Sequence, residues 1–79
     1  MDSTRELVIS IIKRVISDHG KNPDDIDAQS SMGSPRSWDS MVFVEIFESI
    51  GTEFGLDLSD DDAVHFMSVA EIVEFVESN

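Results

Sequence analysis

Cysteine is absent from this 79-residue sequence, and basic residues are scarce. Without thiols the chain can form no disulfide, no thiolate nucleophile and no cysteine-ligated metal site. Five Lys and Arg residues stand against 17 Asp and Glu residues, giving a formal net charge of −12. Such a surface repels nucleic acid and anionic lipid and attracts the basic patches of other proteins. We therefore expect protein partners, with no nucleic acid and no membrane among the binding targets.

Long apolar runs are also missing. No stretch is long enough to span a bilayer, and the N-terminus lacks the pattern of a signal peptide, so we expect a cytoplasmic protein. With 41% hydrophobic residues in periodic blocks, the chain should fold rather than remain disordered. The length fits one domain over residues 1–79, which we expect to be a monomer.

Apolar residues recur at helical spacing along most of the chain. The spacing predicts helices at about 4–18, 40–54, 60–66 and 69–77, with a long loop over residues 20–39. No alternating run is long enough for a strand. The fold class is therefore all-α, a small four-helix bundle of three main helices plus a short third helix. The buried stripe of the second helix is expected to consist of Phe43, Ile46, Phe47, Ile50 and Phe54.

Capping signals mark where these helices begin. Ser3 with Glu6 and Ser68 with Glu71 both match the capping box, in which a serine and an acid three residues later satisfy free backbone groups. Ser59 precedes an acidic run and should cap the short third helix. In the long loop, the apolar residues that we expect to be buried are Ile26, Met32 and Trp38.

The tetrapeptide Trp38-Asp39-Ser40-Met41 stands where the loop runs into the second helix. Asp39 is expected to be the N-cap, which places the Ser40 hydroxyl on the first helical turn. A helix N-terminus presents free N–H groups and a partial positive charge, so it suits a phosphate attached to that hydroxyl. An ordinary helix cap with no further role is the alternative interpretation.

A serine hydrolase does not fit the sequence. The two histidines, His19 and His65, belong to the ends of other helices, and no GxSxG motif is present. A calcium-binding loop does not fit either, because an EF-hand beginning at Asp57 would need glycine at Asp62 and glutamate at Ser68. We expect no catalytic activity and no metal site. A serine at a helix N-terminus can still accept a group from a second enzyme, which would make the protein a substrate and a carrier.

The chain resembles the acyl carrier proteins of the phosphopantetheine-binding family over nearly its whole length. The family's attachment motif is Asp-Ser followed by Leu or Met, matched by Asp39-Ser40-Met41, and a preceding Trp is a common variant. The end of the family's second helix is matched by the segment 53–58, with sequence EFGLDL. The short acidic third helix is matched by 59–62, and the start of the fourth helix by 68–73.

This resemblance implies a covalent prosthetic group. Ser40 would carry 4′-phosphopantetheine through a phosphodiester, and the thiol of that arm would hold an acyl or aminoacyl group as a thioester. A phosphopantetheinyl transferase would install the arm from coenzyme A with magnesium. Further partners would be an acyl or aminoacyl loading enzyme and a downstream synthase or transferase. The expected partner-binding residues on the second helix, opposite its apolar stripe, are Met41, Val44, Glu45 and Glu48.

The sequence departs from the fatty-acid members of the family at three places. Pro35-Arg36-Ser37-Trp38 replaces their Asp-Leu-Gly-Ala, Val42 and Phe43 replace acids, and Gly51 and Thr52 replace acids further along. These changes indicate a specialised carrier of a secondary-metabolite or amino-acid-activating pathway. A peptidyl or aminoacyl carrier of a nonribosomal pathway and an unmodified acidic interaction module remain as alternatives.

Overall fold

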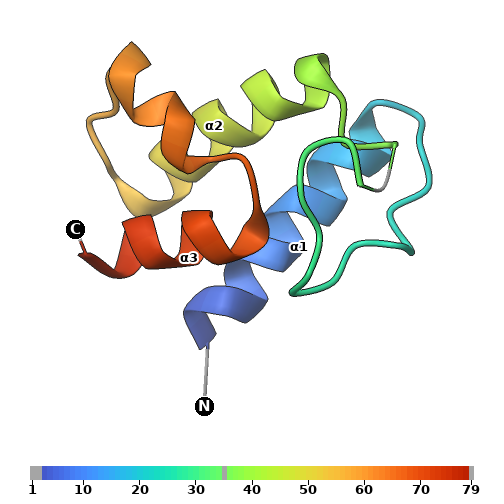
Figure 1. Ribbon diagram of the computed structural model, residues 1–79, viewed down its shortest axis with the longest axis horizontal. Helices are drawn as coiled ribbons and strands as arrows, with labels where there is room; N and C mark the ends of the chain where they lie inside the picture. The colour runs from blue at the N-terminus through green and yellow to red at the C-terminus, as the bar shows by residue number, and fades with distance from the viewer. Residues whose placement is uncertain (1–2, 35, 79) are drawn as a thin grey trace.

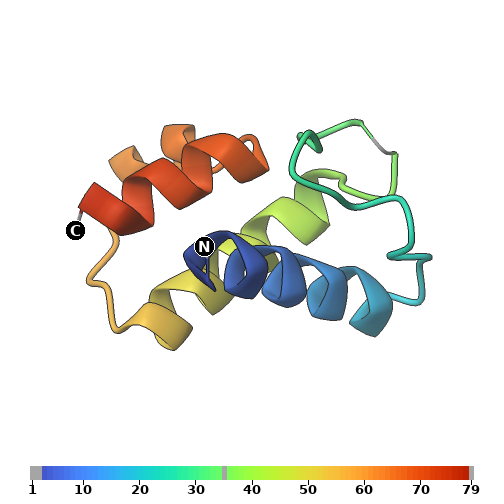
Figure 2. The same cartoon turned by 90° about the horizontal axis from the view of Figure 1, so that it is seen from below.

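The protein is a bundle of helices around one apolar core, seen here in a computed structural model that describes residues 3–34 and 36–78. Its elements are α1 (Ser3–Asp18), α2 (Ser40–Phe54), the short 3-10 helix η1 (Asp60–His65) and α3 (Val69–Ser78). α1 packs against both α2 and α3, and η1 packs against α3 (Figures 1 and 2). The predicted all-α fold with a long first connection is confirmed.

The core draws on every main helix and on the long loop. Ile26 and Trp38 from the loop are buried as expected, whereas Met32 is only partly buried. Burying a large apolar side chain contributes about 1.5–3 kcal/mol, so these residues hold the loop to the bundle. The buried residues of the helices are Val8, Ile11, Ile12, Val15 and Ile16 in α1, Val42, Ile46 and Ile50 in α2, and Val69, Ile72 and Val73 in α3.

The buried face of α2 differs from the predicted stripe. Val42 is fully buried, in line with Ile46 and Ile50, although the sequence pattern did not assign it to the core. The three phenylalanines of α2 are only partly buried at the edge of this face. One of them, Phe47, makes an edge-to-face contact with Phe66 at a centroid distance of 4.9 Å. The apolar face of α2 is thus wider than one stripe, and its centre is aliphatic.

The third helix also differs from the prediction. It is a 3-10 helix, and it ends at His65. Its hydrogen bonds span three residues: the Asp62 N–H donates to the Ser59 carbonyl and the Phe66 N–H donates to the Ala63 carbonyl, both at 3.0 Å. None of its own residues is fully buried, so no apolar stripe favours a longer α-helix.

The predicted caps have different outcomes. The Asp62 carboxylate accepts the Ser59 N–H at 3.0 Å, and the Ser68 hydroxyl accepts the Glu71 N–H at 3.1 Å, so both later helices begin where expected. Ser3, in contrast, lies within α1, so the predicted cap at that residue is wrong. Pro35 lies outside the described residues.

The long loop is tied to the start of α3. The Met32 N–H donates to the Met67 carbonyl at 2.8 Å, and the Val69 N–H donates to the Ser30 carbonyl at 3.0 Å. The Ser30 side chain is buried, and its hydroxyl accepts the Asp27 N–H at 2.9 Å. The loop therefore has a fixed position beside the bundle. No helix of the described residues has the length and apolar content that crossing a membrane requires.

Candidate functional site

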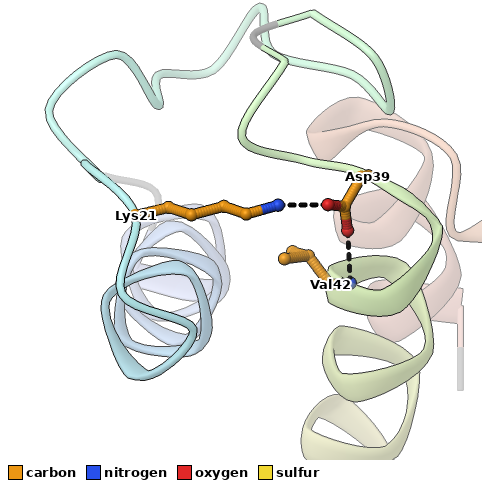
Figure 3. Close-up of polar contacts among 3 residues, drawn as sticks. All are labelled: Lys21, Asp39 and Val42. Atoms are coloured by element: carbon orange, nitrogen blue, oxygen red, sulfur yellow. Dashed lines mark hydrogen bonds and ion pairs between the residues drawn. The ribbon is translucent and has the colours of Figure 1, made fainter.

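Ser40 is the first residue of α2, and its side chain is exposed. Asp39 before it has an extended backbone, with φ −98° and ψ −174°, and its Oδ1 accepts the Val42 N–H at 3.0 Å (Figure 3). Asp39 is therefore the N-cap. Trp38 is fully buried, and its carbonyl accepts the Gly33 N–H at 2.8 Å. The serine is thus exposed to solvent at a helix start that the buried Trp38 side chain holds in place.

Lys21 is held beside this cap by the end of α1. Gly20, with φ 76°, adopts the left-handed conformation and donates its N–H to Ser17, while the Lys21 N–H reaches back to Ile16 at 3.1 Å. These two bonds form a Schellman motif, which fixes the direction in which the chain leaves a helix. From this position Lys21 Nζ forms an ion pair and hydrogen bond with Asp39 Oδ2 (Figure 3).

These contacts change the acidity of the cap. The hydrogen bond from Lys21 and the backbone N–H of Val42 both favour the carboxylate form, so they lower the pKa of Asp39 below its ordinary value. A group with a lowered pKa in the folded state stabilises the fold at pH values above its unfolded pKa, which is about 3.9 for Asp. This contribution is lost as the pH falls through the lowered pKa.

Asp39→Asn should therefore be less stable than the wild type at neutral pH, because Asn can cap the helix but cannot pair with Lys21. We expect a melting temperature about 2–5 °C lower at pH 7. The difference should begin to shrink as the pH falls below the unfolded pKa of about 4, and it should disappear once the pH has fallen through the lowered pKa of folded Asp39. Thermal melts of both proteins over a pH series measure this difference. The other carboxylates are present in both proteins, so their effects on the melting temperature cancel in the comparison. A difference that does not change with pH would contradict the role of the Asp39 charge.

The surroundings of Ser40 fit a phosphate group. The first turn of α2 carries no acidic side chain, because Met41, Val42 and Phe43 follow the serine. The positive end of the helix dipole, together with any N–H of this turn that Asp39 does not bind, favours an anion at the hydroxyl. Lys21 adds a positive charge beside Asp39, the residue that precedes Ser40. The residues present could therefore hold a phosphodiester at Ser40.

The histidines do not form a catalytic pair with Ser40. His19 Nε2 lies 3.8 Å from Glu45 Oε1, and the His65 ring stacks on Phe75 with a centroid distance of 5.5 Å. Among the described residues, no three acidic or histidine side chains gather closely enough to hold a metal ion.

The four residues expected to bind partners share the exposed side of α2. Met41 is 70% exposed and Val44 is 53% exposed, although both are large and apolar. Glu45 and Glu48 are exposed as well. We call Met41, Val44, Glu45 and Glu48 the α2 face. By the rotation of 100° per residue, Glu48 lies between Met41 and Val44 at the centre of this face, and Glu45 lies at its edge toward α1.

Sequence reasoning missed the ion pairs that connect α1 and the turn after it with α2 and its N-cap. Lys21 contacts the cap, His19 contacts Glu45, and Arg14 Nη2 lies 3.4 Å from Glu53 Oε1. The only signal in the sequence was Gly20, which places Lys21 directly after the end of α1. The acid with which each basic residue pairs depends on how α1 packs against α2, which the sequence alone does not show.

Several acyl carrier proteins are similar to this chain in sequence. The acyl carrier protein of Rickettsia bellii strain RML369-C is 30% identical over 69 residues, which cover 87% of this chain and 80% of that protein. The acyl carrier protein of Rickettsia bellii strain OSU 85-389 is 29% identical over 69 residues, with 87% and 85% covered. The acyl carrier protein of Chlamydia trachomatis serovar L2 is 25% identical over 69 residues, with 86% and 90% covered. No profile of a known protein family matches the chain.

A small helical bundle that presents an exposed serine at a capped helix start has the features of a carrier protein. Together with the similarity to the first Rickettsia protein over most of both sequences, this places the chain in the acyl carrier protein family. Members of the family are carriers rather than catalysts, and the predicted family is confirmed.

Proposed function

We propose that this protein holds an acyl or aminoacyl group as a thioester on 4′-phosphopantetheine attached to Ser40. The observation that carries the proposal is the exposed hydroxyl at the first turn of α2, beside the Asp39 cap and without an acid in that turn. The group, when attached, supplies a long flexible arm with a terminal thiol. The chain itself supplies the attachment point, the electrostatic environment of the phosphate and the surface that partners bind.

Attachment requires little chemistry from the chain. The Ser40 hydroxyl loses its proton to a base of the transferase, and its oxygen forms a bond to the phosphorus of coenzyme A that bears the pantetheine arm. The bond from that phosphorus to the leaving adenosine 3′,5′-bisphosphate breaks. An exposed serine with no basic partner of its own fits this role, because the transferase supplies both base and metal.

Intact-protein mass spectrometry tests the proposal directly. The purified protein is incubated with coenzyme A, magnesium and a phosphopantetheinyl transferase of broad specificity. We expect a mass gain of one phosphopantetheinyl group per chain. No gain with transferases that modify a control acyl carrier protein would leave an unmodified acidic interaction module as the function.

The departures from the fatty-acid members of the family have different physical meanings. Val42 is fully buried, so core packing explains the apolar residue at that position. At Gly51 a Cβ atom would lie 3.0 Å from Leu58 Cδ1, so a larger residue there would require the Leu58 side chain to shift. Thr52 is exposed, as is Arg36 in the loop before the site. These two surface positions support our proposal of a specialised pathway. We further propose that the protein acts in the cytoplasm, as expected from the sequence.

The α2 face is the proposed surface for the transferase, the loading enzyme and the downstream synthase. It combines apolar anchors with negative charge, and exposed methionine adapts its shape to different partners. A partner with a basic rim around an apolar socket would be complementary to it. The core does not require any of its four residues, since all are exposed.

Charge reversal on the α2 face should weaken the transferase reaction. Glu48→Lys and Glu45→Lys should each lower kcat/KM about tenfold at low salt, because they remove electrostatic attraction to a basic partner. Added salt should reduce the defect. Glu74→Lys on α3 makes the same charge change elsewhere and serves as the control. If both α2 variants match this control, the face does not contact the transferase.

A further inference from the structure

Lys21 occupies an unusual position among the basic residues, because it neutralises the acid next to the attachment serine. Its side chain is 35% exposed and that of Asp39 is 42% exposed, so the pair lies at the surface but is partly shielded from solvent. The Schellman motif at the end of α1 fixes its backbone, and Figure 3 shows the side chain extending from there to the cap.

The Asp39 carboxylate has two opposing effects on the site. It caps α2 by accepting the Val42 N–H, a hydrogen bond that is stronger when the carboxylate is charged. That same charge stands one residue from the hydroxyl that would receive an anionic phosphodiester. Two negative charges at such a distance repel each other, and the repulsion is strongest where protein shields them from water. A cation that binds Oδ2 of the carboxylate offsets this repulsion and leaves Oδ1 free to accept the Val42 N–H.

We propose that Lys21 is a positioning residue of the attachment site, which holds Asp39 in its capping orientation and offsets its charge when Ser40 carries the phosphodiester. This inference rests on the proposed function. The bond geometry supports it, since Lys21 binds Oδ2 while Val42 binds Oδ1, so both oxygens of the carboxylate have a donor. Lys21 thereby links the end of α1 to the start of α2 at the modified residue.

The test compares Lys21→Met with Lys13→Met. Both changes remove one lysine charge for a side chain of similar length, but Lys13 is an exposed residue of α1 outside the site. Two quantities are measured for each variant. The first is kcat/KM for modification by the transferase with coenzyme A. The second is the difference in melting temperature between the modified and the unmodified protein.

Lys21→Met should lower kcat/KM about tenfold, the effect expected for one charge-assisted hydrogen bond that positions a reacting group. Its modified form should melt at a lower temperature than its unmodified form by a larger margin than in the wild type. Lys13→Met should match the wild type in both quantities. Lys21→Arg keeps the charge and the donors, so it should retain most of the wild-type behaviour, and a cooperative melt of unmodified Lys21→Met shows that the methionine variant is folded.

A purely structural role of Lys21 would lower the melting temperatures of both forms equally and leave their difference unchanged. The proposal requires both quantities to separate Lys21→Met from Lys13→Met, and equality in either one overturns it. Failure of the proposed function has a different signature, because then the wild type itself gains no phosphopantetheinyl mass, and the role of Lys21 falls with it.

Discussion

Ser40→Ala is expected to fold like the wild type and to gain no mass when it is incubated with coenzyme A and a transferase. The variant loses only an exposed hydroxyl, so the helix content and melting temperature should change little. The loss of modification should be complete, because Ser40 supplies the side-chain hydroxyl at the start of α2 and the residue that follows it, Met41, has none. This is the largest effect that we expect from any single substitution.

A matched control is available on the same helix. Ser49→Ala removes a hydroxyl from the middle of α2 and should leave the mass gain intact. Circular dichroism and intact-protein mass spectrometry on both variants measure fold and modification separately. A mass gain in Ser40→Ala would show that the attachment residue has been assigned incorrectly, even if the protein is a carrier.

Trp38→Ala should have the largest effect on stability. The side chain is fully buried, and truncating a buried aromatic residue to alanine costs about 3–5 kcal/mol. A domain of this length is stable by roughly 4–12 kcal/mol in total, so the loss would bring the protein close to unfolding. Because Trp38 directly precedes the cap, the start of α2 should loosen first.

Trp38→Phe separates the effect of packing from that of the indole N–H. The Nε1 atom of Trp38 is buried and has no hydrogen-bond partner among the described residues. Replacing the ring by phenyl removes this unsatisfied donor and keeps most of the apolar volume, so the loss of stability should be much smaller. Urea unfolding followed by circular dichroism measures both variants. Equal destabilisation by Ala and Phe would mean that the volume of the ring is not what anchors the loop.

The helices could be predicted well from the sequence because their signals are local. The bounds of α2 coincide with the predicted range, since Asp39 and Gly55 mark its two ends. The expectations that failed depend on the neighbours of a segment. The spacing rule could not show that Val42 faces the core, because that requires the direction from which α1 approaches. It also could not distinguish a 3-10 helix from an α-helix in the acidic segment of η1.

The candidate site shows the same division. Ser40 and its cap were predictable, since the motif and the helix start lie within a few residues of each other. The contact between Lys21 and Asp39 joins residues that are 18 positions apart, and its formation depends on two independent features, the turn after α1 and the docking of α2. Sequence reasoning named both elements without their relative placement, so it missed the ion pair.

The hydrogen bonds of the long loop also determine where the chain can be altered in length. Residues 30–33 are bonded to Met67, Val69 and Trp38, so an inserted residue there would break backbone pairs that hold the loop near the starts of α2 and α3. Asp24 and Asp25 lie earlier in the same loop and are exposed. A label attached to the side chain of Asp24 or Asp25 should leave Ser40 and its surroundings intact, whereas an inserted residue there would interrupt the bond from the Ile26 N–H to the Pro23 carbonyl at 3.1 Å.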